Sequence, residues 1–170
     1  MTSLEMKPAV GTGKIMKTGD LILALDFDGT CVEHANPPAI GAEIGAAPYL
    51  KALSDAGVKM ILWTMRSEGY TGLNNPGAPH DALAPALSWF QKHQIKLWGI
   101  NQNHDQAWTQ SPKVYAHLVL DDTALGCPLV RVEGRRPYVD WKQAGPALFA
   151  WAGLPETKLT DIKAGAKDWS

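Results

Sequence analysis

Four aspartates and a threonine stand directly after short apolar runs, and side chains of these types suit the chemistry of a metal ion and a phosphate group. They are Asp26 and Asp28 after 21–25, Thr64 after 58–63, and Asp121 and Asp122 after 116–120. Crowded carboxylates raise one another's pKa unless a cation is present. Oxygen ligands of this kind suit Mg²⁺, which commonly binds carboxylates together with a substrate phosphate.

The spacing of the first pair favours a shared ligand. Residues i and i+2 of an extended chain point to the same side, so Asp26 and Asp28 can face one site. Gly29 follows at once and permits the backbone to turn sharply. An Asp-rich turn that only caps an element is the structural alternative. The polar residues after two further apolar runs favour the functional interpretation.

The elements that must position these residues alternate along the chain. Apolar runs predict strands at 21–25, 58–63, 96–100 and 116–120, with a fifth, edge strand at 129–132. Helical spacing predicts helices over about 42–55, 81–93 and within 140–152. This alternation is typical of an α/β fold with a mainly parallel sheet covered on both faces. Ligands of such folds bind outside the carboxyl ends of the strands.

Length and composition predict one globular unit. The chain has 170 residues, 45% of them hydrophobic, and a formal net charge of −1. We expect a tail or loose element at 1–19, one domain over 20–153, and a tail or short helix at 154–170. The loops 67–80 and 101–112 begin near strand ends, so we expect them to line the site.

Charge and cysteine content indicate which kinds of partner and which cellular compartment to expect. The 16 Lys and Arg against 17 Asp and Glu show no basic surplus, so nucleic acid is not indicated, although a local basic patch stays open. Two cysteines make neither a disulfide framework nor a zinc motif. No apolar stretch is long enough to cross a membrane, and no secretory signal is recognisable. We therefore expect a cytoplasmic protein; a homo-oligomer is possible.

The order of these segments resembles the haloacid dehalogenase-like phosphohydrolases. The resemblance rests on LALDFDGT at 23–30, ILWT at 61–64, Lys113, and LVLDD at 118–122. Small capless members are the most similar, because they share the segment CVEH at 31–34 and an arginine at the place of Arg66. The resemblance implies a three-layer Rossmann-like fold without a cap domain. The gaps between the motifs leave no room for a folded cap.

The resemblance also implies a magnesium-dependent phosphatase acting on a phosphate monoester. Asp26 would be the nucleophile that forms an aspartyl-phosphate. Asp28 would protonate the leaving oxygen and then take a proton from water. Thr64 would bind a phosphoryl oxygen, and Lys113 would offset negative charge. A lysine before a strand is more often a solvated surface charge, so the place of Lys113 eight residues before Asp121 carries this assignment.

The metal and substrate ligands follow from the same resemblance. Mg²⁺ would be bound by Asp26, the backbone of Asp28, Asp121 and Asp122, and the substrate by Gly29, Thr30 and Arg66. An arginine at this place can instead pair with a nearby acid. The histidines in predicted loops, His34 among them, are expected at the surface or along the substrate.

Three other functions use similar residues. A phospho-receiver places its acidic pair after the first strand, which is the reverse of the order here. A nucleic-acid end phosphatase or phosphotransferase would need a basic groove beside the site. A non-catalytic module that binds phosphate and metal would keep the same motifs without turnover. The order of the motifs and the second acid, Asp28, favour the phosphatase over the phospho-receiver, and the sequence leaves the other two alternatives open.

Overall fold

A four-stranded parallel sheet brings the predicted strand ends to one edge. The strands are β1 (Ile22–Leu25), β2 (Lys59–Leu62), β3 (Gly99–Ile100) and β4 (Leu118–Leu120), in the order β3-β2-β1-β4. In the register, Leu25 lies opposite both Leu62 and Leu120, so β1, β2 and β4 end level with one another. All four residues of β1 are buried, as a central strand without polar residues requires. The computed structural model describes residues 16–72, 77–155, 157, 159–160 and 162.

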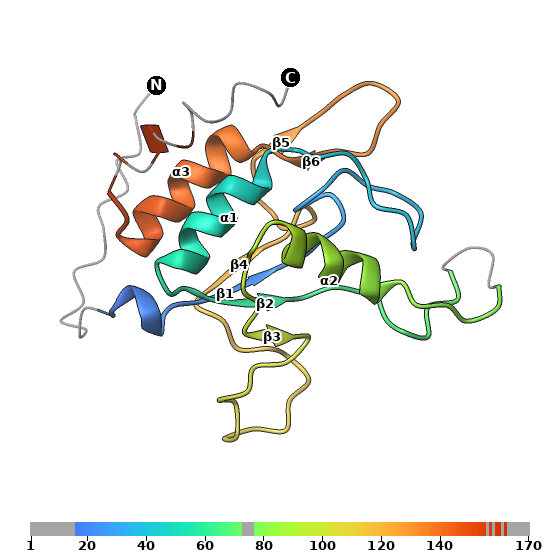
Figure 1. Ribbon diagram of the computed structural model, residues 1–170, viewed down its shortest axis with the longest axis horizontal. Helices are drawn as coiled ribbons and strands as arrows, with labels where there is room; N and C mark the ends of the chain where they lie inside the picture. The colour runs from blue at the N-terminus through green and yellow to red at the C-terminus, as the bar shows by residue number, and fades with distance from the viewer. Residues whose placement is uncertain (1–15, 73–76, 156, 158, 161, 163–170) are drawn as a thin grey trace.

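The three helices with defined bounds cover one face of this sheet. They are α1 (Ala46–Asp55), α2 (Leu83–Lys92) and α3 (Trp141–Ala152), and α1 and α3 lie side by side (Figure 1). Their buried residues share a single core with the side chains of β1 and β2 that point to this face. The Asp140 carboxylate caps α3 by accepting a hydrogen bond from the backbone N–H of Lys142 at 3.0 Å.

In the described part of the chain, the opposite face of the sheet is covered not by the helices that we expected but by other structure. A smaller cluster centres there on Ile22, Ala24 and Ile61, and its outer members are Trp63, Trp98, Val114 and Ala116. The segment 101–117 supplies part of this cover, loops out on the side away from the helices, and contains no helix (Figure 1). The α/β class and the parallel sheet are confirmed, whereas the described residues form a third layer of irregular backbone and side chains rather than of helices.

Other expectations also need correction. Residues 129–132 do not form an edge strand of the sheet, because β5 (Leu129–Val130) pairs antiparallel with β6 (Tyr138–Val139) in a separate hairpin. α1 begins at Ala46, four residues later than expected, after Gly45 in the left-handed conformation. Thr18–Asp20 form a 3₁₀ turn at the end of the segment predicted as a tail or loose element, and residues 157, 159, 160 and 162 are helical within the segment predicted as a tail or short helix.

Two further features concern the cysteines and the length of the helices. Cys31 and Cys127 are both free thiols, and Cys31 is buried. No helix in the described part of the chain is long and apolar enough to span a bilayer.

Candidate active site

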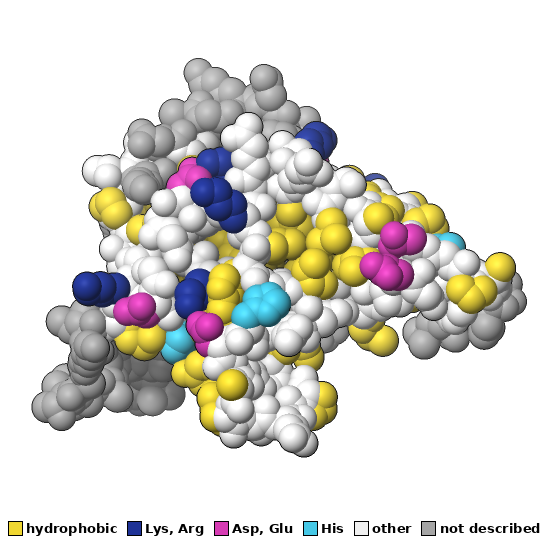
Figure 2. Space-filling model, turned by 60° about the horizontal axis from the view of Figure 1, so that its bottom comes forward, with side chains coloured by type: hydrophobic (Ala, Val, Ile, Leu, Met, Phe, Trp, Pro, Cys, Tyr) yellow, Lys and Arg dark blue, Asp and Glu magenta, His cyan; other side chains and the backbone are white. Residues whose placement is uncertain are grey.

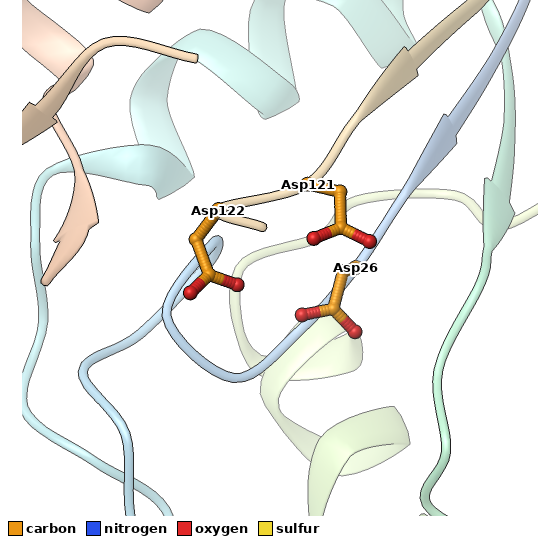
Figure 3. A group of neighbouring side chains, drawn as sticks. All are labelled: Asp26, Asp121 and Asp122. Atoms are coloured by element: carbon orange, nitrogen blue, oxygen red, sulfur yellow. The ribbon is translucent and has the colours of Figure 1, made fainter. Parts of the chain in front are cut away.

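Three carboxylates converge where β1 and β4 end. Asp26 follows β1, and Asp121 and Asp122 follow β4, so pairing of these two strands places the three side chains together (Figure 3). One carboxylate oxygen from each lies within 4.8 Å of the others. The backbone N–H of Asp26 donates to the carbonyl of Leu120 at 3.0 Å, which ties the two strand ends to one another. The predicted convergence of these three aspartates is confirmed.

Burial and repulsion between the carboxylates raise the pKa of Asp26 and of Asp122, and the shift is larger at Asp26. Burial, followed by the charges of Asp121, Asp122 and Asp28, raises the pKa of Asp26 from 3.8 to about 7, against the opposing hydrogen bond from the Phe27 backbone. Burial also raises the pKa of Asp122, although contact with His34 counteracts this. The three side chains therefore form a site that favours a bound proton or another cation.

We predict that the metal-free protein loses stability as the pH rises from about 4 to about 7. The folded state holds the Asp26 proton with a pKa of about 7, whereas the unfolded chain releases it near 3.8, so deprotonation favours unfolding in this window. The free energy of unfolding should fall by on the order of 2 kcal/mol, after allowance for partial exposure. Urea titrations in chelator across this range measure the slope. Asp26→Asn should flatten it, and an equal slope in that variant would contradict the assignment.

The turn after Asp26 is shaped by buried backbone contacts. Its backbone N–H groups at Thr30, Cys31 and Val32 all point to the carbonyl of Phe27. Gly29 has a positive φ of 80°, and a Cβ there would lie 2.2 Å from Nε2 of His34 and 2.8 Å from Cγ of Asp122. Only glycine therefore permits both side chains to pack against the turn.

Thr30 has a structural role rather than the predicted contact with substrate. Its side chain is fully buried, and its Oγ1 accepts a hydrogen bond from the backbone N–H of Asp122 at 3.1 Å. Its carbonyl accepts a hydrogen bond from Nε1 of Trp141 at 2.7 Å. Thr30 thus fixes the position of Asp122, and neither it nor Gly29 is among the residues that line the cavity.

Arg66 holds Asp28 in place through two parallel hydrogen bonds. Its Nε and Nη2 donate to the two carboxylate oxygens of Asp28 at 2.8 and 2.7 Å. The remaining donors reach the carbonyls of Pro38, Ala39 and Ala82 at 3.4, 2.7 and 3.2 Å. These bonds occupy all five N–H groups of the guanidinium. The arginine is 2% exposed, so it positions Asp28 and is not the expected ligand of the substrate.

Thr64 lies at the end of β2 with its hydroxyl available to donate. Its Oγ1 accepts a hydrogen bond from the backbone N–H of Arg66 at 3.2 Å, which leaves the hydroxyl proton free for another acceptor. Asn101, which follows β3, holds the Thr64 backbone in place: its side chain accepts from the N–H at 2.8 Å and donates to the carbonyl at 2.9 Å. Thr64 therefore meets the geometric requirement for a phosphoryl contact.

His34 and Arg136 both interact with Asp122. Nε2 of His34 lies 3.0 Å from Oδ2 of Asp122. Arg136 lowers the pKa of Asp122 through its charge. Asp121 is held differently, since its Oδ1 accepts hydrogen bonds from the backbone and hydroxyl of Thr123 at 2.7 and 2.6 Å.

These residues surround one cavity of about 680 Å³ at the edge of the sheet. Its lining includes Asp26, Asp28, Thr64, Asp121 and Asp122 together with His34, Trp63, Arg66, Tyr70, Asn101 and Arg136. Lys113 is not among the lining residues. It is an exposed member of the segment that joins β3 to β4, where its carbonyl accepts a hydrogen bond from Nε2 of Gln106 at 2.9 Å.

One solved structure is similar to this fold. It is described as the structure of a conserved protein coded by a locus from Bacteroides thetaiotaomicron, with a TM-score of 0.53 and 26% sequence identity. The match covers 82% of this chain and 96% of the other. No family model and no curated protein matches the chain. The likeness supports the α/β fold, and its description states no activity.

Three residues of the site were not predicted as site residues from the sequence. Only one of them follows a sequence pattern that could have indicated its role. Asn101 follows the third predicted strand, so the rule that selected Asp26 and Asp121 could also have selected it. His34 was expected only at a surface or along a substrate, and its contact with Asp122 depends on the turn at Gly29. Arg136 lies in the β5–β6 hairpin, and nothing in its local sequence indicates that it reaches the cavity.

Proposed function

We propose that this protein is a magnesium-dependent phosphatase with a haloacid dehalogenase-like fold, acting on phosphate monoesters through Asp26. One observation carries the proposal. A single cavity holds a nucleophilic carboxylate, two neighbouring carboxylates that suit a metal ion, a second acid fixed by an arginine, and a threonine hydroxyl free to donate. Phosphoryl transfer depends mainly on such positioning and on charge stabilisation.

The first step forms an aspartyl-phosphate. An oxygen of Asp26 attacks phosphorus, and the bond from phosphorus to the leaving oxygen breaks. Asp28 donates its proton to that oxygen, so the product alcohol leaves neutral. Each oxygen of Asp28 accepts one bond from Arg66, which leaves a lone pair on each for the proton. Thr64 donates its hydroxyl hydrogen to a phosphoryl oxygen.

The second step returns the enzyme to its starting state. A water molecule gives a proton to Asp28 and attacks phosphorus, and the bond to Asp26 breaks. Inorganic phosphate leaves, and Asp28 again carries the proton needed for the next cycle. Because Arg66 holds the orientation of Asp28, the same carboxyl group can serve the leaving oxygen and the incoming water.

The donor set fits Mg²⁺. Asp26, Asp121 and Asp122 would hold it, together with the carbonyl of Asp28. One oxygen from each of the three carboxylates lies within 4.8 Å of the others, and anionic oxygens are the ligands that Mg²⁺ prefers. When bound, the ion offsets the negative charge that would otherwise keep the carboxylate and the phosphate apart.

Replacement of Asp121 by asparagine should weaken Mg²⁺ binding by about tenfold or more. The change removes one anionic oxygen ligand and keeps the shape of the side chain. Calorimetric titration with MgCl₂ measures the affinity. Asp105→Asn is the matched control, because Asp105 pairs with Lys59 at 2.9 Å, outside the cavity. An unchanged affinity in Asp121→Asn would place the metal elsewhere.

The surroundings of the site favour a small phosphorylated metabolite over a nucleic-acid end. A second cavity of about 620 Å³ shares His34, Tyr70 and Arg136 with the first and can accept the leaving group. Among the described residues, Arg136 is the one exposed cation in the two linings. On the face in Figure 2, the Lys and Arg side chains of the described residues are interspersed with Asp and Glu and form no continuous basic groove.

The test is release of inorganic phosphate from an aryl phosphate and from a panel of phosphorylated metabolites. Each reaction is run with MgCl₂ and with excess chelator. We expect turnover that depends on Mg²⁺ and is restored when the metal is returned. Release that is equally fast in chelator would overturn the metal dependence. Absence of turnover on the whole panel, together with measurable binding of Mg²⁺ and phosphate, would favour the non-catalytic module.

A further inference from the structure

The site needs a cation for the phosphoryl group beyond any metal ion, and two of the obvious side chains do not supply it. Four aspartates line the cavity, while a phosphate monoester adds about two further negative charges near neutral pH. Arg66 has no free donor, because its five N–H groups all bond to Asp28 and to backbone carbonyls.

Lys113 does not occupy the cavity wall either. Gln106, Ser111 and Val114, which belong to the same segment as Lys113, line a smaller hollow of about 260 Å³ after β3. The backbone of Lys113 is bound within the same segment, through the hydroxyl of Ser111 and the side chain of Gln106. Within the described residues, its ammonium forms no ion pair with the three carboxylates, and Lys113 does not line their cavity.

Arg136 occupies the position that Lys113 does not. It lines the cavity with the carboxylates and also the adjoining cavity, so it stands where the two meet. Its side chain is exposed, and within the described residues it makes no hydrogen bond or ion pair. Its guanidinium donors are thus available to a ligand in either cavity.

The hairpin that carries Arg136 is fastened to the nucleophile turn. The N–H of Val139 donates to the carbonyl of Gly29 at 2.8 Å, next to the bond from Trp141 to Thr30. On the other side of Arg136, the guanidinium of Arg135 contacts the carboxylate of Glu33 at 3.1 Å. These contacts set the distance between the hairpin and the carboxylates, although the loop itself is exposed.

We propose that Arg136, and not Lys113, is the cationic side chain that binds the phosphoryl oxygens of the substrate. This inference rests on the proposed phosphatase function. A planar guanidinium can donate two parallel hydrogen bonds to a phosphoryl group, whereas an ammonium acts as a point charge. Arg136 lies where the two cavities meet. It can therefore bind the phosphoryl group in the first cavity while the rest of the substrate extends into the second.

The experiment measures binding of inorganic phosphate by calorimetry in MgCl₂ and the kcat/KM for the best substrate of the panel. The variants are Arg136→Ala, Arg136→Lys and Lys113→Ala. Arg131→Ala is the matched control, because Arg131 belongs to the same hairpin, is exposed, and lines neither cavity. The Asp26→Asn variant reports separately on the proposed function.

We expect Arg136→Ala to weaken phosphate binding by about tenfold or more and to lower kcat/KM by about 30-fold or more, with partial rescue in Arg136→Lys. Arg131→Ala and Lys113→Ala should stay within about twofold of wild type. Near-wild-type behaviour of Arg136→Ala, or a larger loss in Lys113→Ala, would overturn the inference while turnover through Asp26 remained. A wild type that neither binds phosphate nor hydrolyses any substrate would overturn both proposals.

Discussion

Asp26→Asn should abolish turnover, lowering kcat by about a thousandfold or more, in a protein that remains folded. The amide that replaces the carboxylate is a poor nucleophile, so the aspartyl-phosphate does not form. The fold should survive because the substitution keeps the shape of the side chain and removes one of four acidic groups that are crowded together. Phosphate release measures the rate, and thermal unfolding followed by circular dichroism measures the stability.

Two further measurements make this result specific. Asp55→Asn is the control, because Asp55 pairs with Lys51 on the exposed side of α1 and should leave the rate unchanged. Acid quenching of the wild type during turnover should trap a phosphorylated protein, detectable by mass spectrometry, that Asp26→Asn lacks. Full turnover in Asp26→Asn, or a phosphoryl group on another residue, would refute the assignment of the nucleophile.

The part of the site that depends on sheet topology could be predicted from the sequence. Asp26, Thr64 and Asp121 each follow an apolar run, and neighbouring parallel strands end at one edge. The runs themselves are clear because a strand buried on both faces has few polar residues, as the four buried residues of β1 show. The positions of the carboxylates could thus be predicted from the strand ends alone, whatever the structure of the loops.

The roles of the arginines and of Lys113 could not be predicted in this way. The acceptors of Arg66 come from three segments, at Asp28, at 38–39 and at Ala82, which only the folded chain brings together. Arg136 reaches the cavity because β5 and β6 form a hairpin, whereas the sequence suggested an edge strand there. Lys113 has the expected spacing before Asp121, but spacing along an irregular segment does not determine where a side chain points.

The layer that covers the second face of the sheet could not be predicted from the sequence either. Apolar runs predict which strands are buried, but they do not determine what covers each face. Helices cover one face, and the other is covered by Trp98, Val114 and Ala116 from irregular backbone. Tryptophan is large enough to bury a wide apolar area without a helix.

Arg66→Met should lower the free energy of unfolding by about 3 kcal/mol or more and reduce kcat by about a hundredfold or more. Methionine fills a similar volume, but it leaves Asp28 without its counter-charge and removes the donors to three carbonyls that are held in the same region. Loss of one partner of a buried ion pair is strongly destabilising for this reason. Urea unfolding and phosphate release measure the two effects. Arg135→Ala removes an arginine–carboxylate pair that is exposed, so it should cost less than about 1 kcal/mol.

Arg66→Lys separates the positioning of Asp28 from the stability of the fold. Lysine keeps the charge, but its ammonium cannot make two parallel hydrogen bonds to one carboxylate. We therefore expect much of the stability to return while kcat stays low and its pH profile changes, because Asp28 is paired but no longer held in one orientation. Binding of Mg²⁺ should be affected little, since the carboxylates of Asp26, Asp121 and Asp122 are positioned by other contacts. Recovery of both stability and wild-type kcat in Arg66→Lys would show that a positive charge alone suffices, and that the two-bond geometry does not control catalysis.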